Sequence, residues 1–166
     1  VYKRQVYGSS KLAGVRAATA ELGDRVTFVR TSWVCGVHGK NMVMLVRRLA
    51  AQGAPMAFVD DQRGCPTFTA DLAPALVTLA GERHGGVFHL TNGGAVSWYE
   101  FVGEILDASG HARSLVSPIT TDELDPPRPA PRPANSVLAN RRWVDTGHIP
   151  LRDHREPLAE LVERLG

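Results

Sequence analysis

The sequence predicts an α/β fold, because segments with the spacing of amphipathic helices alternate with short segments rich in β-branched and aromatic residues. The first helical segment is 9–22, where apolar residues recur three or four apart at Leu12, Val15, Ala18 and Leu22. The segment 25–34 that follows (Arg-Val-Thr-Phe-Val-Arg-Thr-Ser-Trp-Val) predicts a strand. A chain of 166 residues fits one domain with a sizeable core.

The next third of the chain repeats this alternation. Residues 41–52 predict a helix that Asn41 caps, with an expected apolar face of Met42, Leu45, Val46 and Leu49. Residues 56–59 predict a short strand that leads into a polar loop, 60–67. Thr69 is expected to cap a helix over 70–79.

In the last third, residues 86–91 and 115–119 predict strands, and Ser97 with Glu100 forms a capping box that opens a helix to about Ala108. Residues 125–133 hold five prolines and favour extended polyproline geometry. A short helix is expected over 138–144, and a final helix over 156–165 carries Pro157 in its first turn.

Composition excludes several functional classes. A net charge of +2 is too small to indicate nucleic-acid binding, and no apolar run approaches the roughly 20 residues of a membrane span. The two cysteines, Cys35 and Cys65, stand far apart, which argues against a disulfide framework or zinc site and favours a reducing, cytoplasmic setting. The pair Asp60 and Asp61 lacks a third ligand at metal spacing, so we predict no metal site and expect either a solvated loop or side chains that cap nearby amides.

The sequence Tyr7-Gly8-Ser9-Ser10-Lys11 holds a tyrosine and a lysine four residues apart, which a helix places on one face. A neighbouring ammonium favours the phenolate, and so lowers the pKa of a phenol from its ordinary value of about 10. Such a pair can exchange a proton with a carbonyl or hydroxyl oxygen. The spacing also arises by chance on solvated helices, so other segments must support the catalytic interpretation.

Four segments, in order, resemble the dTDP-4-dehydrorhamnose reductase family of extended short-chain dehydrogenases/reductases. They are 7–14, which holds the Tyr-x-x-x-Lys motif; 30–41, with Arg-Thr-Ser-Trp-Val and Gly-Lys-Asn; 60–73, with Asp-Asp-Gln-Arg-Gly-Cys-Pro-Thr and Asp-Leu-Ala; and 132–136, Arg-Pro-Ala-Asn-Ser. The resemblance implies part of a Rossmann-type doubly wound sheet and a smaller substrate-binding α/β region. Residues 1–35 would end the NAD(P)-binding domain, and 36–166 would mostly form the substrate-binding region, with some elements returning to the sheet.

The resemblance also implies a reaction, in which NADPH or NADH reduces the C4 ketone of a dTDP-4-dehydro-6-deoxy sugar. Tyr7 would act as general acid and Lys11 would hold the nicotinamide ribose. Further cofactor contacts would come from Arg30, Thr31 and Ser32, and substrate contacts from Trp33, Asn41 and Arg132. Magnesium and a homodimer are compatible with the family, but nothing in the sequence indicates either.

Two departures from the family pattern lead us to expect a fragment that is inactive alone. No glycine-rich dinucleotide fingerprint follows a strand, and the chain starts at Val1, within ten residues of Tyr7. Residues 1–5 look like translated adapter sequence, and Cys35 replaces the tyrosine that usually follows Trp-Val in the family.

Three alternatives remain open at this point. The first is an epimerase or dehydratase of the same superfamily, which shares the Tyr-x-x-x-Lys motif. The second is a non-catalytic regulatory subunit on the same scaffold. The third is a proline-rich interaction module built on 125–133.

Overall fold

The computed structural model describes residues 2–128 and 130–166, and its strands pair in four short two-stranded sheets. Strand β1 (Thr27–Arg30) pairs in parallel with β6 (Gly86–His89), and β2 (Val34–Cys35) with β5 (Thr67–Phe68). Strand β3 (Met56–Val59) pairs in parallel with β8 (Val116–Ile119), while β4 (Arg63–Gly64) and β7 (Val96–Ser97) are antiparallel. The α/β class is therefore confirmed.

Six α-helices accompany these strands in the described residues. They are α1 (Tyr2–Leu22), α2 (Met42–Ala51), α3 (Thr69–Glu82), α4 (Trp98–Ala108), α5 (Arg141–Asp145) and α6 (Arg155–Arg164). Short 3-10 turns lie at Gly23–Arg25, Arg113–Leu115 and Thr121–Glu123. Among the described helices, none is both long enough and apolar enough to cross a bilayer.

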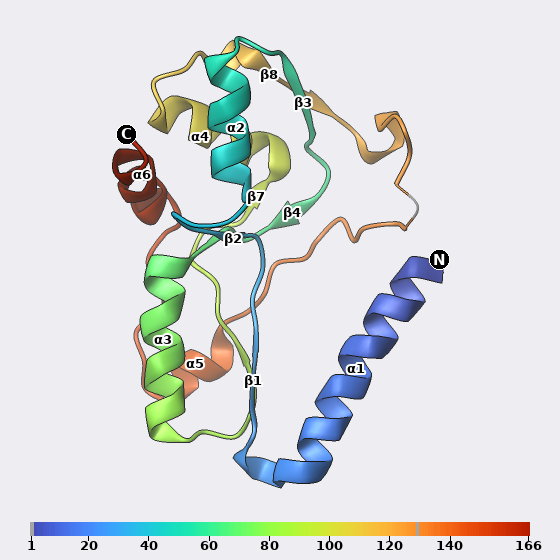
Figure 1. Ribbon diagram of the computed structural model, residues 1–166, viewed down its shortest axis with the longest axis vertical. Helices are drawn as coiled ribbons and strands as arrows, with labels where there is room; N and C mark the ends of the chain where they lie inside the picture. The colour runs from blue at the N-terminus through green and yellow to red at the C-terminus, as the bar shows by residue number, and fades with distance from the viewer. Residues whose placement is uncertain (1, 129) are drawn as a thin grey trace.

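The buried side chains form two clusters, one at each end of the molecule (Figure 1). The larger cluster lies between α2, α4, α6 and the β3–β8 pair, and its fully buried members include Val46, Phe101 and Ile105. The smaller one joins α3 to β6 and α5 through Leu79, Phe88 and other buried residues. Strands β2, β4 and β7 lie in a middle zone between the two ends of the molecule (Figure 1), where Cys35 of β2 and Val96 of β7 belong to the larger cluster.

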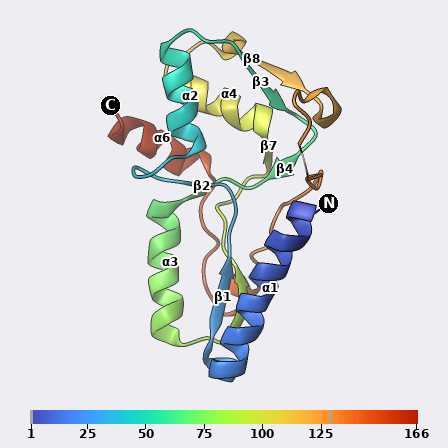
Figure 2. The same ribbon diagram turned by 45° about the vertical axis from the view of Figure 1, so that its right-hand side comes forward.

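Helix α1 stands apart from both clusters. It flanks β1 on the side opposite α3, and its N-terminal end lies beside the loop that follows β8 (Figures 1 and 2). Two of the apolar side chains that mark the predicted helix are exposed here, Leu12 at 48% and Leu22 at 44%. The predicted helix is confirmed, and it begins earlier than expected, at Tyr2.

Two predicted helix starts are confirmed, while one helix begins later than predicted and another turns a different face to the core. Asn41 caps α2 by accepting a hydrogen bond from the Met44 amide, and the capping box at Ser97 and Glu100 opens α4. The helix predicted over 138–144 begins only at Arg141. The fully buried side of α2 is Val43, Val46 and Ala50, so the predicted apolar face is rotated by about one residue.

Two predictions near the middle zone are wrong. The strand expected over 25–34 is interrupted, because Trp33 adopts φ 45°, a left-handed conformation that cannot continue a strand. Thr69 does not cap α3; Phe68 is the N-cap residue, and the amide of Phe68 donates to the Asn92 side chain at 2.9 Å. The Thr69 hydroxyl instead packs closely over Gly36, at a point where a side chain would not fit.

Candidate active site

Two of the family-like segments meet just beyond the end of β1. The Ser32 hydroxyl donates to the Cys65 carbonyl at 2.7 Å, and the Thr67 amide donates to the Trp33 carbonyl at 3.2 Å. Strands β2 and β5 then pair in parallel immediately afterwards. The loop of residues 60–67 is thereby fixed against the carboxyl end of β1, the edge at which open α/β sheets bind ligands.

A third family-like segment joins the same place from a distant part of the chain. The Arg63 amide donates to the Ala134 carbonyl at 2.8 Å, and both the amide and the hydroxyl of Ser136 donate to the Arg63 carbonyl at 2.9 Å. These bonds anchor the end of the proline-rich loop to β4. Arg132 lies two residues before Ala134 and is exposed to solvent.

Trp33 forms the floor of this junction. Its indole stacks on that of Trp98, with ring centroids 3.6 Å apart and an interplanar angle of 17°. A Cβ added to Gly64 would lie 2.6 Å from the Trp33 ring, so only glycine lets β4 pass this closely. Trp33 is half-buried in this arrangement.

Trp98 and Arg63 are site-forming residues that the sequence analysis missed. Trp98 is the first residue of α4, so the capping box at Ser97 was a usable signal for its position. The Arg63 guanidinium pairs with Glu100 at 3.1 Å and donates to the Ala95 carbonyl at 2.7 Å, which ties β4 to the start of α4. Because these two contacts engage the Arg63 guanidinium, we assign Arg63 the role of holding β4 in place beside Trp33.

Asn41 lies to one side of this junction and has a structural task. Its Oδ1 accepts from the Met44 amide at 3.2 Å, and its Nδ2 donates to the Gly36 carbonyl at 2.8 Å. The same residue lines an open hollow of about 650 Å³, in which Lys40 and Arg48 supply positive charge. A substrate contact from Asn41 stays a prediction.

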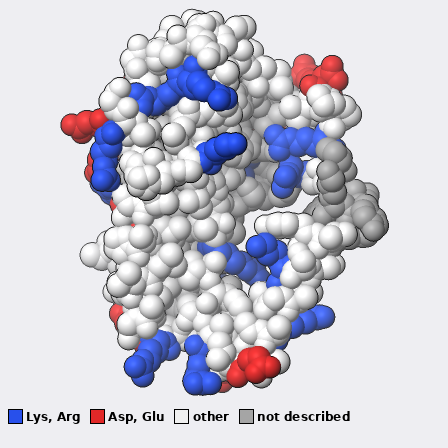
Figure 3. Space-filling view, in the orientation of Figure 1, with Lys and Arg blue, Asp and Glu red and all other residues white. Residues whose placement is uncertain are grey.

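Tyr7 and Lys11 lie on one face of α1, as the spacing predicts. The Lys11 ammonium is 5.6 Å from the centre of the Tyr7 ring, and the Tyr7 side chain is exposed at 66%. Arg30 and Thr31, at the carboxyl end of β1, are also exposed. Figure 3 shows Lys and Arg side chains on both sides of the hollow between α1 and the rest of the molecule, a surface that favours an anionic ligand.

Of the paired aspartates, Asp61 caps an amide, one of the two roles that the sequence leaves open, and Asp60 accepts from a hydroxyl. Asp61 accepts from the amide and the hydroxyl of Thr121 at 2.9 and 2.7 Å, and the backbone bond and then the hydroxyl bond hold its pKa below the usual range. Asp60 accepts from the Ser97 hydroxyl. Both carboxylates therefore fasten the loop of residues 60–67 to its neighbours.

Cys35 fills the position where the family pattern has tyrosine. The side chain is only 2% exposed, and burial raises the pKa of the thiol to about 11. A protonated thiol in the core contributes packing, and it is a poor nucleophile.

Parallel strands with flanking helices, a tyrosine–lysine pair and an aromatic floor at a strand end define a Rossmann-type protein of the extended short-chain dehydrogenase/reductase class. The chain belongs to the RmlD substrate binding domain family, whose family model matches residues 4–166.

Comparison with known proteins supports this placement. The chain is 41% identical over 162 residues to a dTDP-4-dehydrorhamnose reductase of Streptomyces griseus, covering 95% of this chain and 53% of that protein. Its fold matches the crystal structure of a dTDP-4-dehydrorhamnose reductase from Clostridium acetobutylicum with a TM-score of 0.87, at 38% identity, over 96% of this chain and 55% of the other. A dTDP-4-dehydrorhamnose reductase from Bacillus anthracis, solved in complex with NADP, matches with a TM-score of 0.85 at 30% identity, over 97% and 55% of the two chains. The chain thus spans about half the length of the curated relatives it matches.

Proposed function

We propose that this chain supplies the acid–base pair and much of the substrate side of an NAD(P)H-dependent reductase that acts on the C4 ketone of dTDP-4-dehydrorhamnose and yields dTDP-L-rhamnose. The observation that carries the proposal is the pairing of Tyr7 and Lys11 on one face of α1, with the ammonium 5.6 Å from the ring centre. The family membership and the reductases among the relatives support the substrate class.

The residues present fit the nicotinamide end of a dinucleotide. When bound, the cofactor supplies a hydride to C4 of the sugar. Tyr7 donates its phenolic proton to the carbonyl oxygen, which becomes the C4 hydroxyl, and Lys11 holds the nicotinamide ribose and favours the phenolate that remains. Arg30, Thr31 and Ser32 would border the cofactor at the carboxyl end of β1.

The segments that meet near the carboxyl end of β1 supply the proposed substrate contacts. The half-buried Trp33 supplies an aromatic ring beside the proposed substrate, and its stack on Trp98 keeps that ring rigid. Arg132 is exposed on the anchored proline-rich loop, where a guanidinium suits a diphosphate. Asn41 borders the neighbouring hollow with Lys40.

The remaining assignments belong to the same proposal. Residues 1–35 would complete an NAD(P)-binding domain, and 36–166 would mostly form the substrate-binding region. A cytoplasmic enzyme that can form a homodimer, with magnesium as an optional ion, is compatible with this account.

The test joins residues 6–166 to the preceding half of the Streptomyces griseus relative and supplies NADPH with dTDP-4-dehydrorhamnose. We expect NADPH oxidation and a product with a C4 hydroxyl. Dehydration or epimerisation of a dTDP-sugar without net NADPH consumption would instead establish the alternative activity. A chimera that binds NADPH but performs none of these reactions would favour the regulatory-subunit interpretation.

A further inference from the structure

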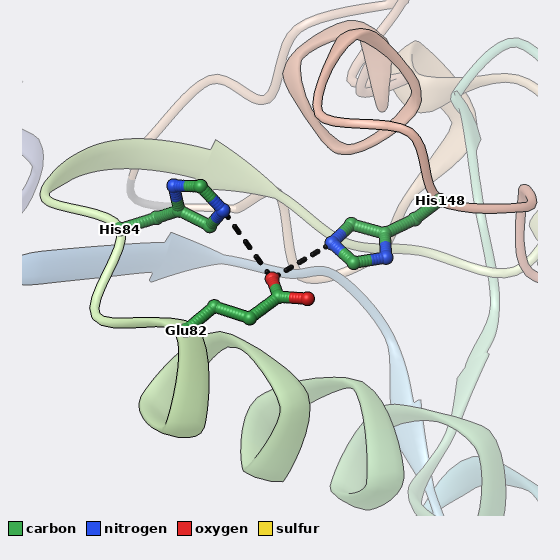
Figure 4. Close-up of side chains that lie close together, drawn as sticks. All are labelled: Glu82, His84 and His148. Carbon is green, nitrogen blue, oxygen red and sulfur yellow. Dashed lines mark hydrogen bonds and ion pairs between the residues drawn. The ribbon is translucent and has the colours of Figure 1, made fainter.

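A second cluster of polar side chains lies at the far end of α3, away from the converging segments of the candidate active site (Figure 1). It consists of Glu82, His84 and His148, whose ligating atoms all lie within 4.8 Å of one another. His148 Nε2 is 2.9 Å from Glu82 Oε2, and His84 Nε2 is 3.3 Å from the same oxygen (Figure 4). Both imidazoles therefore point at one carboxylate oxygen from opposite sides.

The backbone around the first two residues holds them in place. Glu82 ends α3, and Arg83 closes the helix in a left-handed conformation, φ 56°, with its amide donating to the Leu79 carbonyl at 3.1 Å. The turn brings His84 back towards the helix end. The His84 carbonyl then accepts a hydrogen bond from the Thr27 hydroxyl of β1, which fixes the backbone at this position.

His148 reaches the cluster from the segment after α5 and is held by an aromatic contact. Its ring stacks on Trp143, with centroids 3.9 Å apart and an interplanar angle of 22°. Trp143 is buried, and its indole Nε1 donates to the Ile149 carbonyl at 2.8 Å. The loop that carries His148 is therefore held to Trp143 by this hydrogen bond as well as by the ring stack. The imidazole is 17% exposed, which leaves an approach from solvent.

The electrostatics at this point favour a cation. Glu82 lies in the last turn of α3, where the backbone carbonyls already create a negative end. The basic groups beside this end are Arg83, the C-cap residue, and Arg142, which donates to the Gly85 carbonyl at 2.6 Å. A carboxylate is unfavourable at that end of a helix unless positive charge lies beside it. A dication bound by the two imidazole nitrogens and the Glu82 carboxylate would add positive charge at this end.

We propose that Glu82, His84 and His148 bind a divalent transition-metal ion, with Zn²⁺ the best match. Two imidazole nitrogens and one carboxylate oxygen are a donor set that Zn²⁺ accepts, with a fourth position left for water. The ion would fasten the end of α3 to the segment after α5, residues that are more than 60 positions apart in the chain. This site is independent of the proposed hydride chemistry.

The test titrates Zn²⁺ into the metal-stripped 166-residue chain by calorimetry and follows thermal unfolding by circular dichroism. We expect one bound ion per chain and a rise in melting temperature with Zn²⁺. His84→Gln removes one ligand from an accessible side chain, and it should weaken binding about tenfold or more and abolish the thermal shift. His38→Gln, at an exposed histidine on another loop, is the matched control and should bind like the parent.

A second measurement guards against a variant that fails to fold. Imidazole proton resonances of the parent chain should shift for two of the six histidines when Zn²⁺ is added. The absence of one-to-one binding, equal affinity in His84→Gln, or shifts at other histidines would each overturn the proposal.

Discussion

His154 shows at the scale of a single residue how the fold can fix a protonation state. The side chain is 1% exposed, with Nδ1 3.0 Å from the Gly93 carbonyl and Nε2 2.6 Å from the Glu104 carboxylate. A carbonyl and a carboxylate both accept, so both ring nitrogens must carry protons. Burial alone would lower the pKa of His154, but the hydrogen bond and charge of Glu104, with smaller help from Gly93 and Asp153, outweigh it and raise the pKa above 6.5.

This raised pKa predicts a stability that depends on pH. The contribution of His154 is fully present below its unfolded-state pKa of about 6.5, and it is lost as pH rises through the higher folded-state pKa. Urea unfolding of the parent and of His154→Gln, measured between about pH 6 and pH 9, should show a free-energy difference that shrinks as pH rises. A difference that stays constant or grows with pH would show that His154 is neutral in the fold.

Residues with local partners were the predictable ones. Asn41 and the Ser97–Glu100 pair act on amides within three residues, so their sequence spacing revealed their roles. The partners of His154 lie 50 and 61 residues away, and the partner of Trp33 lies on α4. No local pattern specifies such distant contacts, and this is why the aromatic floor and the buried ion pair were not predicted.

At the scale of elements, the path of β4 depends on one glycine. The strand runs over the Trp33 ring, and an added Cβ at Gly64 would lie 2.6 Å from the indole. Gly64→Ala should therefore lower the free energy of unfolding by about 1–3 kcal/mol, because the stack of Trp33 on Trp98 must shift.

The matched control for this prediction is Gly14→Ala in α1. Nothing lies within 4 Å of a Cβ there, and alanine favours a helix interior, so stability should be unchanged or raised by up to about 1 kcal/mol. Chemical denaturation monitored by tryptophan fluorescence reports both variants. Equal stability of Gly64→Ala and the parent would show that the close approach is unimportant.

Elements differ in how well the sequence predicts them. The final helix, α6, and strands β3 and β8 were predicted to within one residue, because hydrophobic spacing and turn residues mark their ends. The long strand over 25–34 was wrong, since β-branched content reports propensity and does not reveal the left-handed turn at Trp33. The spacing in α1 predicted its helix, but spacing alone does not say what an apolar face packs against.

At the scale of the whole molecule, the two buried clusters of the described residues include none from α1, which flanks β1 (Figure 1) with Leu12 and Leu22 exposed. Among the described residues β1 pairs with β6 alone, so the other edge of β1 is free to pair. The tyrosine–lysine pair thus lies on a helix that contributes no side chain to either buried cluster.

This arrangement predicts weak cofactor binding by the 166-residue chain. Its sequence contains no glycine-rich loop after a strand, so backbone amides for a pyrophosphate are not provided. Calorimetry should give an NADPH dissociation constant weaker than about 1 mM. Tight binding that Lys11→Ala abolishes would mean that the chain builds a cofactor site without such a loop.

The central claim, that Tyr7 delivers the proton in a sugar-nucleotide reduction, is tested most directly by the kcat of NADPH oxidation in the chimera with the Streptomyces griseus half. Tyr7→Phe should lower kcat about 10²–10⁴-fold with little change in NADPH affinity, because only the proton donor is removed. Tyr99→Phe, which removes the same hydroxyl from α4, should keep the parent rate. A Tyr7→Phe chimera that turns over within a few-fold of the parent would contradict the account.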